Sequence, residues 1–228
     1  VDAEFVFPDN VTKKCQAVTA LMNGKPELKL VKAELKISNS EPMHYMDDPR
    51  EAVCLKGYSI DGKDASKNSF VITATKDCEF AGVVDCKINV CGKAPSVSYA
   101  SPNDADKEHV YQEIVEYTAD SGYTLDGTAT GKKTFQTECL STGKFKAMDF
   151  LPLKPVTCNV PKQMPHSTRP EAAVVFPNKV VYTCDAGYTL DSKPSDGANN
   201  LYEVTCQANG EFTATQECKP VNCGSPSA

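Results

Sequence analysis

The sequence predicts an all-β protein made of tandem small modules that disulfides staple together. Three observations predict this class. A Gly-Tyr phrase, followed two residues after the Tyr by Ile or Leu and then by Asp, occurs three times along the 228 residues. Eleven cysteines stand at ordered spacings, and several segments alternate apolar with charged residues. A unit that recurs in this way indicates an array in which each repeat is one structural module.

The cysteine content predicts an extracellular protein, either secreted or on a cell surface. Eleven cysteines are far more than a reducing cytosol usually tolerates, and none stands in the close pairs of a zinc site. Asn10-Val-Thr12 is a glycosylation sequon, which agrees with an exposed place in a secreted glycoprotein. No apolar run approaches the roughly 20 residues that a membrane helix requires.

The net charge bears on the kind of partner. A formal charge of −6 argues against nucleic acid or an anionic membrane as the main partner. We therefore expect protein partners, copies of the chain included, with no nucleic acid and no membrane span in this stretch.

The first repeat, residues 15–90, follows a segment without cysteine, residues 1–14, which is a leader, an added edge strand or the tail of a preceding repeat. Apolar and charged residues alternate over 27–37, which predicts a strand with one buried face. The alternation slips at Val31-Lys32, where a bulge or turn would restore the register. A short amphipathic helix is the alternative. A loop rich in turn formers then leads to Cys54.

The second and third repeats, residues 91–157 and 158–222, are joined to their neighbours by linkers of four residues. Such linkers are too short to act as flexible tethers, so neighbouring repeats should abut and form a semi-rigid rod. Residues 223–228 look like the start of a further repeat. Cys223 is then a thiol whose partner lies beyond this stretch, or else it crosslinks chains.

The second repeat lacks two cysteines of the pattern. Ala119 stands at the second cysteine position and Leu153 at the fourth, which makes them a vacant bridge site. If the first cysteine pairs with the third and the second with the fourth, this double loss removes one whole disulfide and leaves no cysteine without a partner. Pairing of neighbours would have left Cys91 and Cys139 without their partners. The expected disulfides are Cys15–Cys78, Cys54–Cys86, Cys91–Cys139, Cys158–Cys206 and Cys184–Cys218.

No catalytic constellation is found in the sequence. His44, His109 and His166 fall in separate repeats, so no two are placed as a base and its orienting partner. The acid-rich turns Asn103–Asp106 and Asp61–Asp64 lack the length and the terminal Glu of a calcium loop. We therefore expect no enzyme activity, no cofactor and no metal.

A unit of about 65 residues with four cysteines, a Gly-Tyr turn after the second and a Gly-x-aromatic after the third resembles the sushi repeat, or complement control protein module. The resemblance is strongest over 158–218, and it implies small elongated β-sandwiches arranged head to tail. The chain departs from the family in having no Trp between the third and fourth cysteines. Phe145, Phe212 and, in the first repeat, Phe80 are expected to take its place in a smaller core.

The resemblance implies a non-enzymatic extracellular protein that mediates protein–protein interaction, adhesion or assembly into a surface coat or filament. One alternative is a soluble ligand-binding protein of the complement-regulator kind. Another is the spacer or targeting arm of a larger enzyme or receptor. Tyr58, Tyr123 and Tyr188 of the Gly-Tyr turns are expected to anchor their hairpins in the core, with a role as exposed binding anchors as the alternative.

Overall fold

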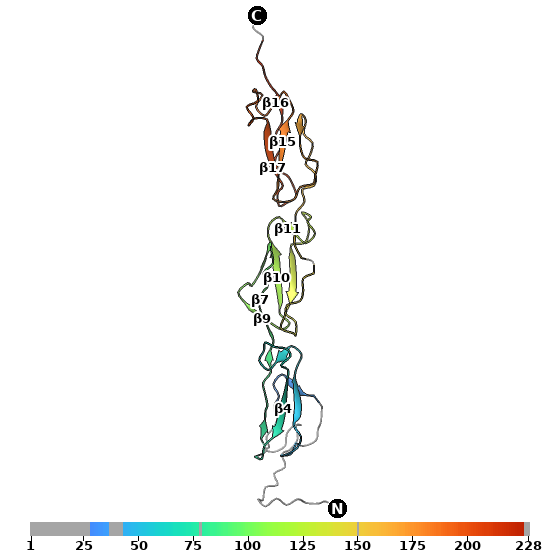
Figure 1. Ribbon diagram of the computed structural model, residues 1–228, viewed down its shortest axis with the longest axis vertical. Coiled ribbons are helices and arrows are strands. Elements are labelled where there is room, and N and C mark those ends of the chain that lie inside the picture. Colours follow the sequence, from blue (N-terminus) through green and yellow to red (C-terminus); the bar gives the residue numbers. More distant parts are fainter. Residues whose placement is uncertain (1–27, 37–42, 78, 150, 226–228) are drawn as a thin grey trace, which may run out of the picture. The chain divides into compact units, whose positions relative to one another are not determined.

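The computed structural model shows an all-β protein, which confirms the predicted class (Figure 1). It describes residues 28–36, 43–77, 79–149 and 151–225, and no helix occurs among them. The chain divides into two compact units, which are described one at a time. The first consists of residues 1–94, 106–114 and 137–146, and the second of residues 95–105, 115–136 and 147–228.

The first unit contains an antiparallel sheet of order β1-β2-β4-β5. Buried and exposed residues alternate along β4, where Phe70 and Ile72 point into the core and Val71 points outward. This is the period-two pattern of a strand with one buried face. The strands are β1 Ala33–Leu35, β2 Arg50–Cys54, β4 Ser69–Ala74 and β5 Phe80–Ala81.

The strand predicted over 27–37 is shorter than expected, and the helical alternative is wrong. Within the described residues 28–36, the strand forms only over Ala33–Leu35, because the chain bends at Val31 and Lys32, where Lys32 has a φ of 55°. A left-handed backbone at a non-glycine residue interrupts any strand. The loop predicted before Cys54 also ends early, since β2 begins at Arg50.

Two small antiparallel pairs complete the first unit. β3 (Tyr58–Ser59) pairs with β6 (Lys87–Ile88), and β7 (Val90–Lys93) pairs with β9 (Glu108–Val110). The first pair joins the Gly-Tyr turn to the linker that follows Cys86.

The second unit contains two sheets of three strands each and two short strand pairs. Its sheets have the orders β12-β10-β8 and β14-β15-β17, with the pairs β11-β13 and β16-β18. Part of β10 and of β12 belongs to the first unit. The strands are β8 Ala100–Pro102, β10 Ile114–Ala119, β11 Tyr123–Thr124, β12 Thr134–Glu138, β13 Lys154–Pro155, β14 Ser167–Thr168, β15 Lys179–Cys184, β16 Tyr188–Thr189, β17 Leu201–Thr205 and β18 Lys219–Pro220.

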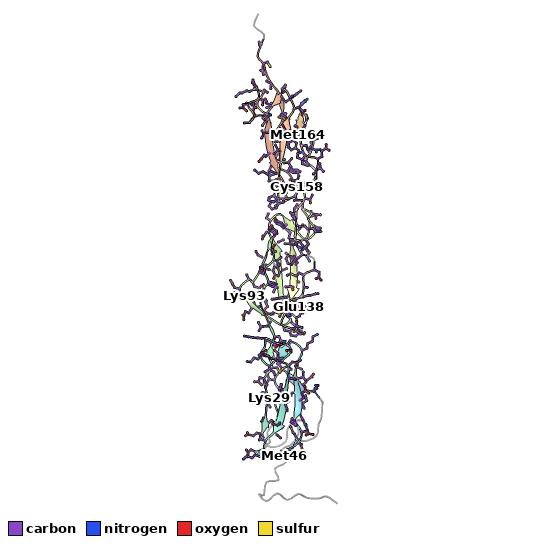
Figure 2. All side chains as sticks on the ribbon, in the orientation of Figure 1. Lys29, Met46, Lys93, Glu138, Cys158 and Met164 are labelled. Carbon is purple, nitrogen blue, oxygen red and sulfur yellow. A yellow bond between two sulfur atoms is a disulfide. The ribbon has the colours of Figure 1, made fainter. Side chains whose placement is uncertain are left out.

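Stacked aromatic rings fill the core of the second unit. Tyr182 and Tyr202 stack at 4.9 Å between ring centroids, and Met164, labelled in Figure 2, packs against their cluster. Tyr117 stacks on Phe135 at 5.1 Å and donates its hydroxyl hydrogen to a backbone carbonyl. Burial raises the pKa of Tyr117 and of Tyr182. These tyrosines therefore supply ring area to a core that has no Trp, and the hydroxyls of Tyr117 and Tyr182 each donate to a backbone carbonyl.

Candidate functional site

Four of the five expected cysteine pairs are disulfides in the structure, with Cα–Cα distances of 5.6 to 5.8 Å. That separation is ordinary for an unstrained bridge. The fifth pair, Cys15–Cys78, and the sequon at Asn10 lie outside the described residues. Cys223 is an exposed free thiol. The four bridges are Cys54–Cys86, Cys91–Cys139, Cys158–Cys206 and Cys184–Cys218.

Ala119 and Leu153 occupy the bridge position of the second repeat, and both are buried. Ala119 ends β10 as Cys184 ends β15, and Leu153 directly precedes β13 as Cys218 precedes β18. Since β11-β13 and β16-β18 have the same register, the two apolar residues correspond in topology to a disulfide of the third repeat. This supports the proposal that they replace one bridge as a pair.

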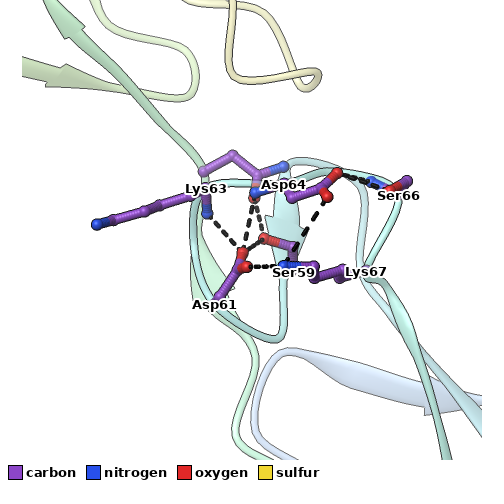
Figure 3. Close-up of polar contacts among 7 residues, drawn as sticks. Ser59, Asp61, Lys63, Asp64, Ser66 and Lys67 are labelled. Atoms are coloured by element: carbon purple, nitrogen blue, oxygen red, sulfur yellow. Dashed lines mark hydrogen bonds and ion pairs between the residues drawn. The ribbon is translucent and has the colours of Figure 1, made fainter.

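The turn after the first Gly-Tyr is held by its own carboxylate (Figure 3). Asp61 accepts backbone hydrogen bonds from Asp64 and Lys63, both at 2.9 Å, and a side-chain bond from Lys67 at 3.0 Å. These donors, with the backbone of Asp64 as the largest cause, hold the pKa of Asp61 well below its usual range. The carboxylate oxygens of Asp61 thus accept hydrogen bonds from donors of the turn itself.

The same device recurs in the other two repeats. Backbone donation from Thr128 lowers the pKa of Asp126, and backbone donation from Lys193 lowers that of Asp191. No cluster of three or more His, Cys, Asp or Glu residues that could hold a metal ion occurs in the described part of the chain.

Replacing Asp61 with Ala is expected to lower the melting temperature of the first repeat at neutral pH. Because the folded pKa of Asp61 is depressed, its contribution is fully present above the unfolded pKa of about 3.9 and is lost as the pH falls further. The difference in melting temperature from the unmodified protein should therefore shrink between about pH 5 and pH 2. Circular dichroism measures this, with Asp61→Asn as the control that keeps one acceptor oxygen. A difference that does not change with pH would contradict the assignment.

The first joint, where the first repeat meets the second, lies within the first unit and is closed by backbone hydrogen bonds. The N–H of Asn89 donates to the carbonyl of Gly57 at 2.8 Å, and the N–H of Tyr111 donates to the carbonyl of Asn89 at 2.9 Å. Gly57 has a φ of 84°, and a Cβ there would lie 1.9 Å from the ring of Tyr111. The joint therefore requires glycine for its backbone and for the ring that covers it.

The Asn89 side chain adds a polar contact to this joint. It is 1% exposed, accepts a hydrogen bond from the hydroxyl of Ser59, and donates from Nδ2 to the carbonyl of Ser141 at 2.7 Å. Ser59 belongs to the first repeat and Ser141 to the second. A buried amide with partners on both sides fixes the two repeats to one another at this point.

The second joint lies within the second unit and repeats the first. The N–H of Val156 donates to the carbonyl of Gly122 at 2.8 Å, and the N–H of Phe176 donates to the carbonyl of Val156 at 2.8 Å. Gly122 has a φ of 85°, and a Cβ there would lie 2.2 Å from the ring of Phe176. Phe176 also meets the ring of Tyr123 edge-on, at 6.0 Å between centroids.

A second glycine of each following repeat sits against the turn of the preceding one. Gly143 faces the carbonyls of Lys63 and Val90, each 3.3 Å from the position of a Cβ. Gly210 faces Ala129, whose Cβ lies 2.8 Å from the position that a Cβ on residue 210 would take. These glycines belong to the Gly-x-Phe segments after the third cysteine. The segment whose Phe is expected to fill the core therefore also contributes its glycine to the joint.

A side chain lies on the ring of each hairpin tyrosine, from a residue just before β1, β8 or β14. All three residues have positive φ, at 55°, 63° and 54°, and they stand at equal intervals along the chain. The tyrosines are partly buried, which agrees with hairpin anchoring. The pairs are Lys32 over Tyr58 at 5.5 Å, Tyr99 on Tyr123 at 4.0 Å and His166 on Tyr188 at 4.0 Å.

The residues that close the joints were not found from the sequence. Tyr111 and Phe176 stand in no shared motif, and their distances along the chain from the preceding Cys91 and Cys158 differ. The equal spacing of the residues that cover the tyrosines was a signal that could have been used. The structure places the predicted histidines apart, with His109 buried beside Phe145 and His166 on Tyr188. In the described ranges, no helix is both long and apolar enough to cross a membrane.

Comparison with known proteins gives one family match and several relatives. Residues 158–220 match the family described as Sushi repeat (SCR repeat). The chain is 27% identical over 121 residues to "Sushi, von Willebrand factor type A, EGF and pentraxin domain-containing protein 1" of Rattus norvegicus, covering 53% of this chain and 3% of that protein. It is 26% identical over 181 residues to the Mus musculus protein of that name, covering 76% of this chain and 4% of that protein.

A shorter relative is matched over more of its length. The chain is 26% identical over 200 residues to Beta-2-glycoprotein 1 of Canis lupus familiaris, covering 82% of this chain and 50% of that protein. The chain thus spans half of this relative and only a few per cent of the two larger ones.

Proposed function

We propose that the chain belongs to the sushi, or complement control protein, module family, and that it is a non-enzymatic extracellular protein whose consecutive modules mediate protein–protein interaction. Within that class we favour adhesion or assembly into a surface coat or filament. The disulfides support an oxidising, extracellular location.

The observation that carries this proposal is the repeated joint. Both joints have an equivalent pair of backbone hydrogen bonds, and in each an aromatic ring, of Tyr111 or of Phe176, lies over the glycine of a Gly-Tyr turn. Repeats fixed in this way need little further ordering when a partner binds across a joint. Such preorganisation raises affinity by lowering the entropic cost of binding.

The outward face of the β15-β17 hairpin is the contact surface that we favour. Val181 and Leu201 are 43% and 42% exposed there and lie diagonally across the two strands. Lys179 and Glu203 form an ion pair at 2.8 Å beside them. An apolar centre with a charged rim is typical of protein contact sites.

Light scattering and electron microscopy of the native protein over a range of concentrations test the proposal. Ordered oligomers that disappear in the double variant Val181→Lys and Leu201→Lys, but persist in the control Ile114→Lys on β10, would support assembly through this face. A monomer that captures a single soluble ligand would favour the complement-regulator alternative. Oligomers unaffected by the double variant would contradict the assignment of the face. The full-length open reading frame tests whether the array is the arm of a larger enzyme or receptor.

A further inference from the structure

The edge strand of the third repeat ends earlier than its counterparts in the other two repeats. In the first repeat β1 is followed by Lys36, whose N–H donates to the carbonyl of Glu51 at 2.9 Å. In the second repeat β8 is followed by Asn103, whose N–H donates to the carbonyl of Glu116 at 3.0 Å. Pro170 takes the equivalent place in the third repeat, and proline has no N–H to donate.

The carbonyl of Val181 is the group that Pro170 leaves open. The register of β14 with β15, when continued, sets Pro170 opposite Val181. The N–H of Cys184 donates to the carbonyl of Asn200, on the side of β17. Because backbone groups alternate in direction along a strand, Val181 directs its carbonyl away from β17 and toward the edge. No backbone N–H of the described residues donates to this carbonyl.

A groove of about 400 Å³ lies beside this open edge. One wall is the segment that begins at Pro170, and the other is the start of β15. Ala172 and Ala173 have short side chains, which leave room for a second backbone along β15. Lys179 donates from its amine to Glu203 of β17 at 2.8 Å, so its charge is held over the sheet rather than across the groove. The volume is within the range of ligand sites, about 300 to 1,000 Å³.

The two closed edges show which kind of side chain belongs opposite this position. The amine of Lys36 binds the carboxylate of Glu51 at 3.0 Å, and Asn103 donates from Nδ2 to the carboxylate of Glu116 at 3.2 Å. The edge residue thus pairs through its side chain with the residue directly opposite, on the same face of the sheet. In the third repeat the opposite residue is Val181, which is apolar and 43% exposed. The side chain that complements it is therefore apolar.

We propose that the edge of β15 beside Pro170 binds an extended peptide segment of a partner protein, which joins the sheet as an added strand. The residue of that segment opposite Val181 donates its N–H to the Val181 carbonyl and packs an apolar side chain against Val181. In the other two repeats a strand of the chain itself covers this place, and this favours an extended segment as the occupant. Main-chain hydrogen bonds supply affinity in such complexes, and the side chains select the partner.

The inference rests on the proposed function in one respect, since it requires a protein partner. It adds which part of the partner binds and which backbone group of this chain receives it.

The probe is the synthetic peptide acetyl-Lys-Thr-Val-Thr-Lys-amide, added to the whole chain labelled with carbon-13 and nitrogen-15. We expect the carbonyl resonance of Val181 to shift as the peptide binds, while those of Glu51 and Glu116 stay in place because they already accept a hydrogen bond. The control peptide carries an N-methyl group on its Val and has no N–H there. It should bind at least about fivefold more weakly, because the hydrogen bond to the carbonyl is lost.

Replacing Pro170 with Asn, the residue of the closed second repeat, is expected to extend β14 and to close the edge. The carbonyl of Val181 should then show a hydrogen-bonded shift without peptide, and the affinity for the peptide should fall by at least about tenfold. Pro194→Asn, in an exposed turn of the same repeat, is the matched control and should leave the affinity unchanged. Peptide mapping of the two disulfides of the third repeat shows that each variant is folded.

Several results would overturn the proposal. These are no binding of either peptide, equal binding of both, or equal binding by the unmodified chain and by Pro170→Asn. A Val181 carbonyl shift that follows protein concentration without peptide would show that a second copy of the chain covers the edge. Oligomers or a captured ligand that the Val181→Lys and Leu201→Lys variant abolishes, but Pro170→Asn leaves intact, would keep the proposed function and overturn the edge as its site.

Discussion

Replacing Cys91 and Cys139 together by serine is expected to unfold the second repeat at physiological temperature. These residues are 48 positions apart, and closing a loop of that length contributes about 4 kcal/mol in the chain-entropy model. The described part of the second repeat contains no other disulfide. A unit of this size has little stability to lose, because it buries a small core.

The matched control is the pair Cys184→Ser and Cys218→Ser in the third repeat. There the Cys158–Cys206 bridge remains, so the repeat should stay folded with a lower melting temperature. Amide exchange resolved along the chain measures both variants. Equal loss of protection in the two repeats would contradict the view that the second repeat depends on one bridge.

Replacing Ala119 and Leu153 together by cysteine is expected to create a disulfide and to stabilise the second repeat. Closing the loop between residues 119 and 153 with a disulfide contributes about 4 kcal/mol to the free energy of unfolding. Removing the buried Leu153 side chain subtracts about 2 kcal/mol, which leaves a gain of about 2 kcal/mol. For a module of this size that corresponds to roughly 10 °C in melting temperature.

Calorimetry of the oxidised and reduced double variant measures this gain, and the two single cysteine variants serve as controls. The gain should vanish on mild reduction. A double variant that folds but leaves both new thiols free would show that Ala119 and Leu153 do not correspond to a bridge.

The sequence predicted the features that depend on local spacing. The recurrence of cysteines and of the Gly-Tyr motif indicated an all-β chain of disulfide-stapled repeats, and the absent cysteines at 119 and 153 are matched by two buried residues at equivalent places in the topology. Apolar and polar residues alternate in the sequence of β4 as they do in burial, because one face of that strand packs on the core while the other faces solvent.

The features that depend on distant contacts could not be predicted in this way. Gly57 is recognisable as a turn residue, but its covering ring, Tyr111, belongs to another repeat and stands in no motif with it. Likewise the slip in the alternation indicated a bulge or turn at Val31-Lys32, where the chain does bend, but it gave no sign that the amine of Lys32 lies over the ring of Tyr58. The local sequence pattern around a residue does not reveal a side-chain contact whose partner lies far along the chain.

The central claim is that consecutive repeats are docked by one recurring joint, in which a linker carbonyl accepts the N–H of an aromatic residue from the next repeat. Hydrogen–deuterium exchange at the amides of Tyr111 and Phe176 tests it most directly. The account predicts that both amides are protected to the level of the adjoining strands, and that both exchange faster when the ring is replaced in Tyr111→Ala and Phe176→Ala. Amides that exchange as freely as those of an exposed loop in the unmodified protein would contradict it.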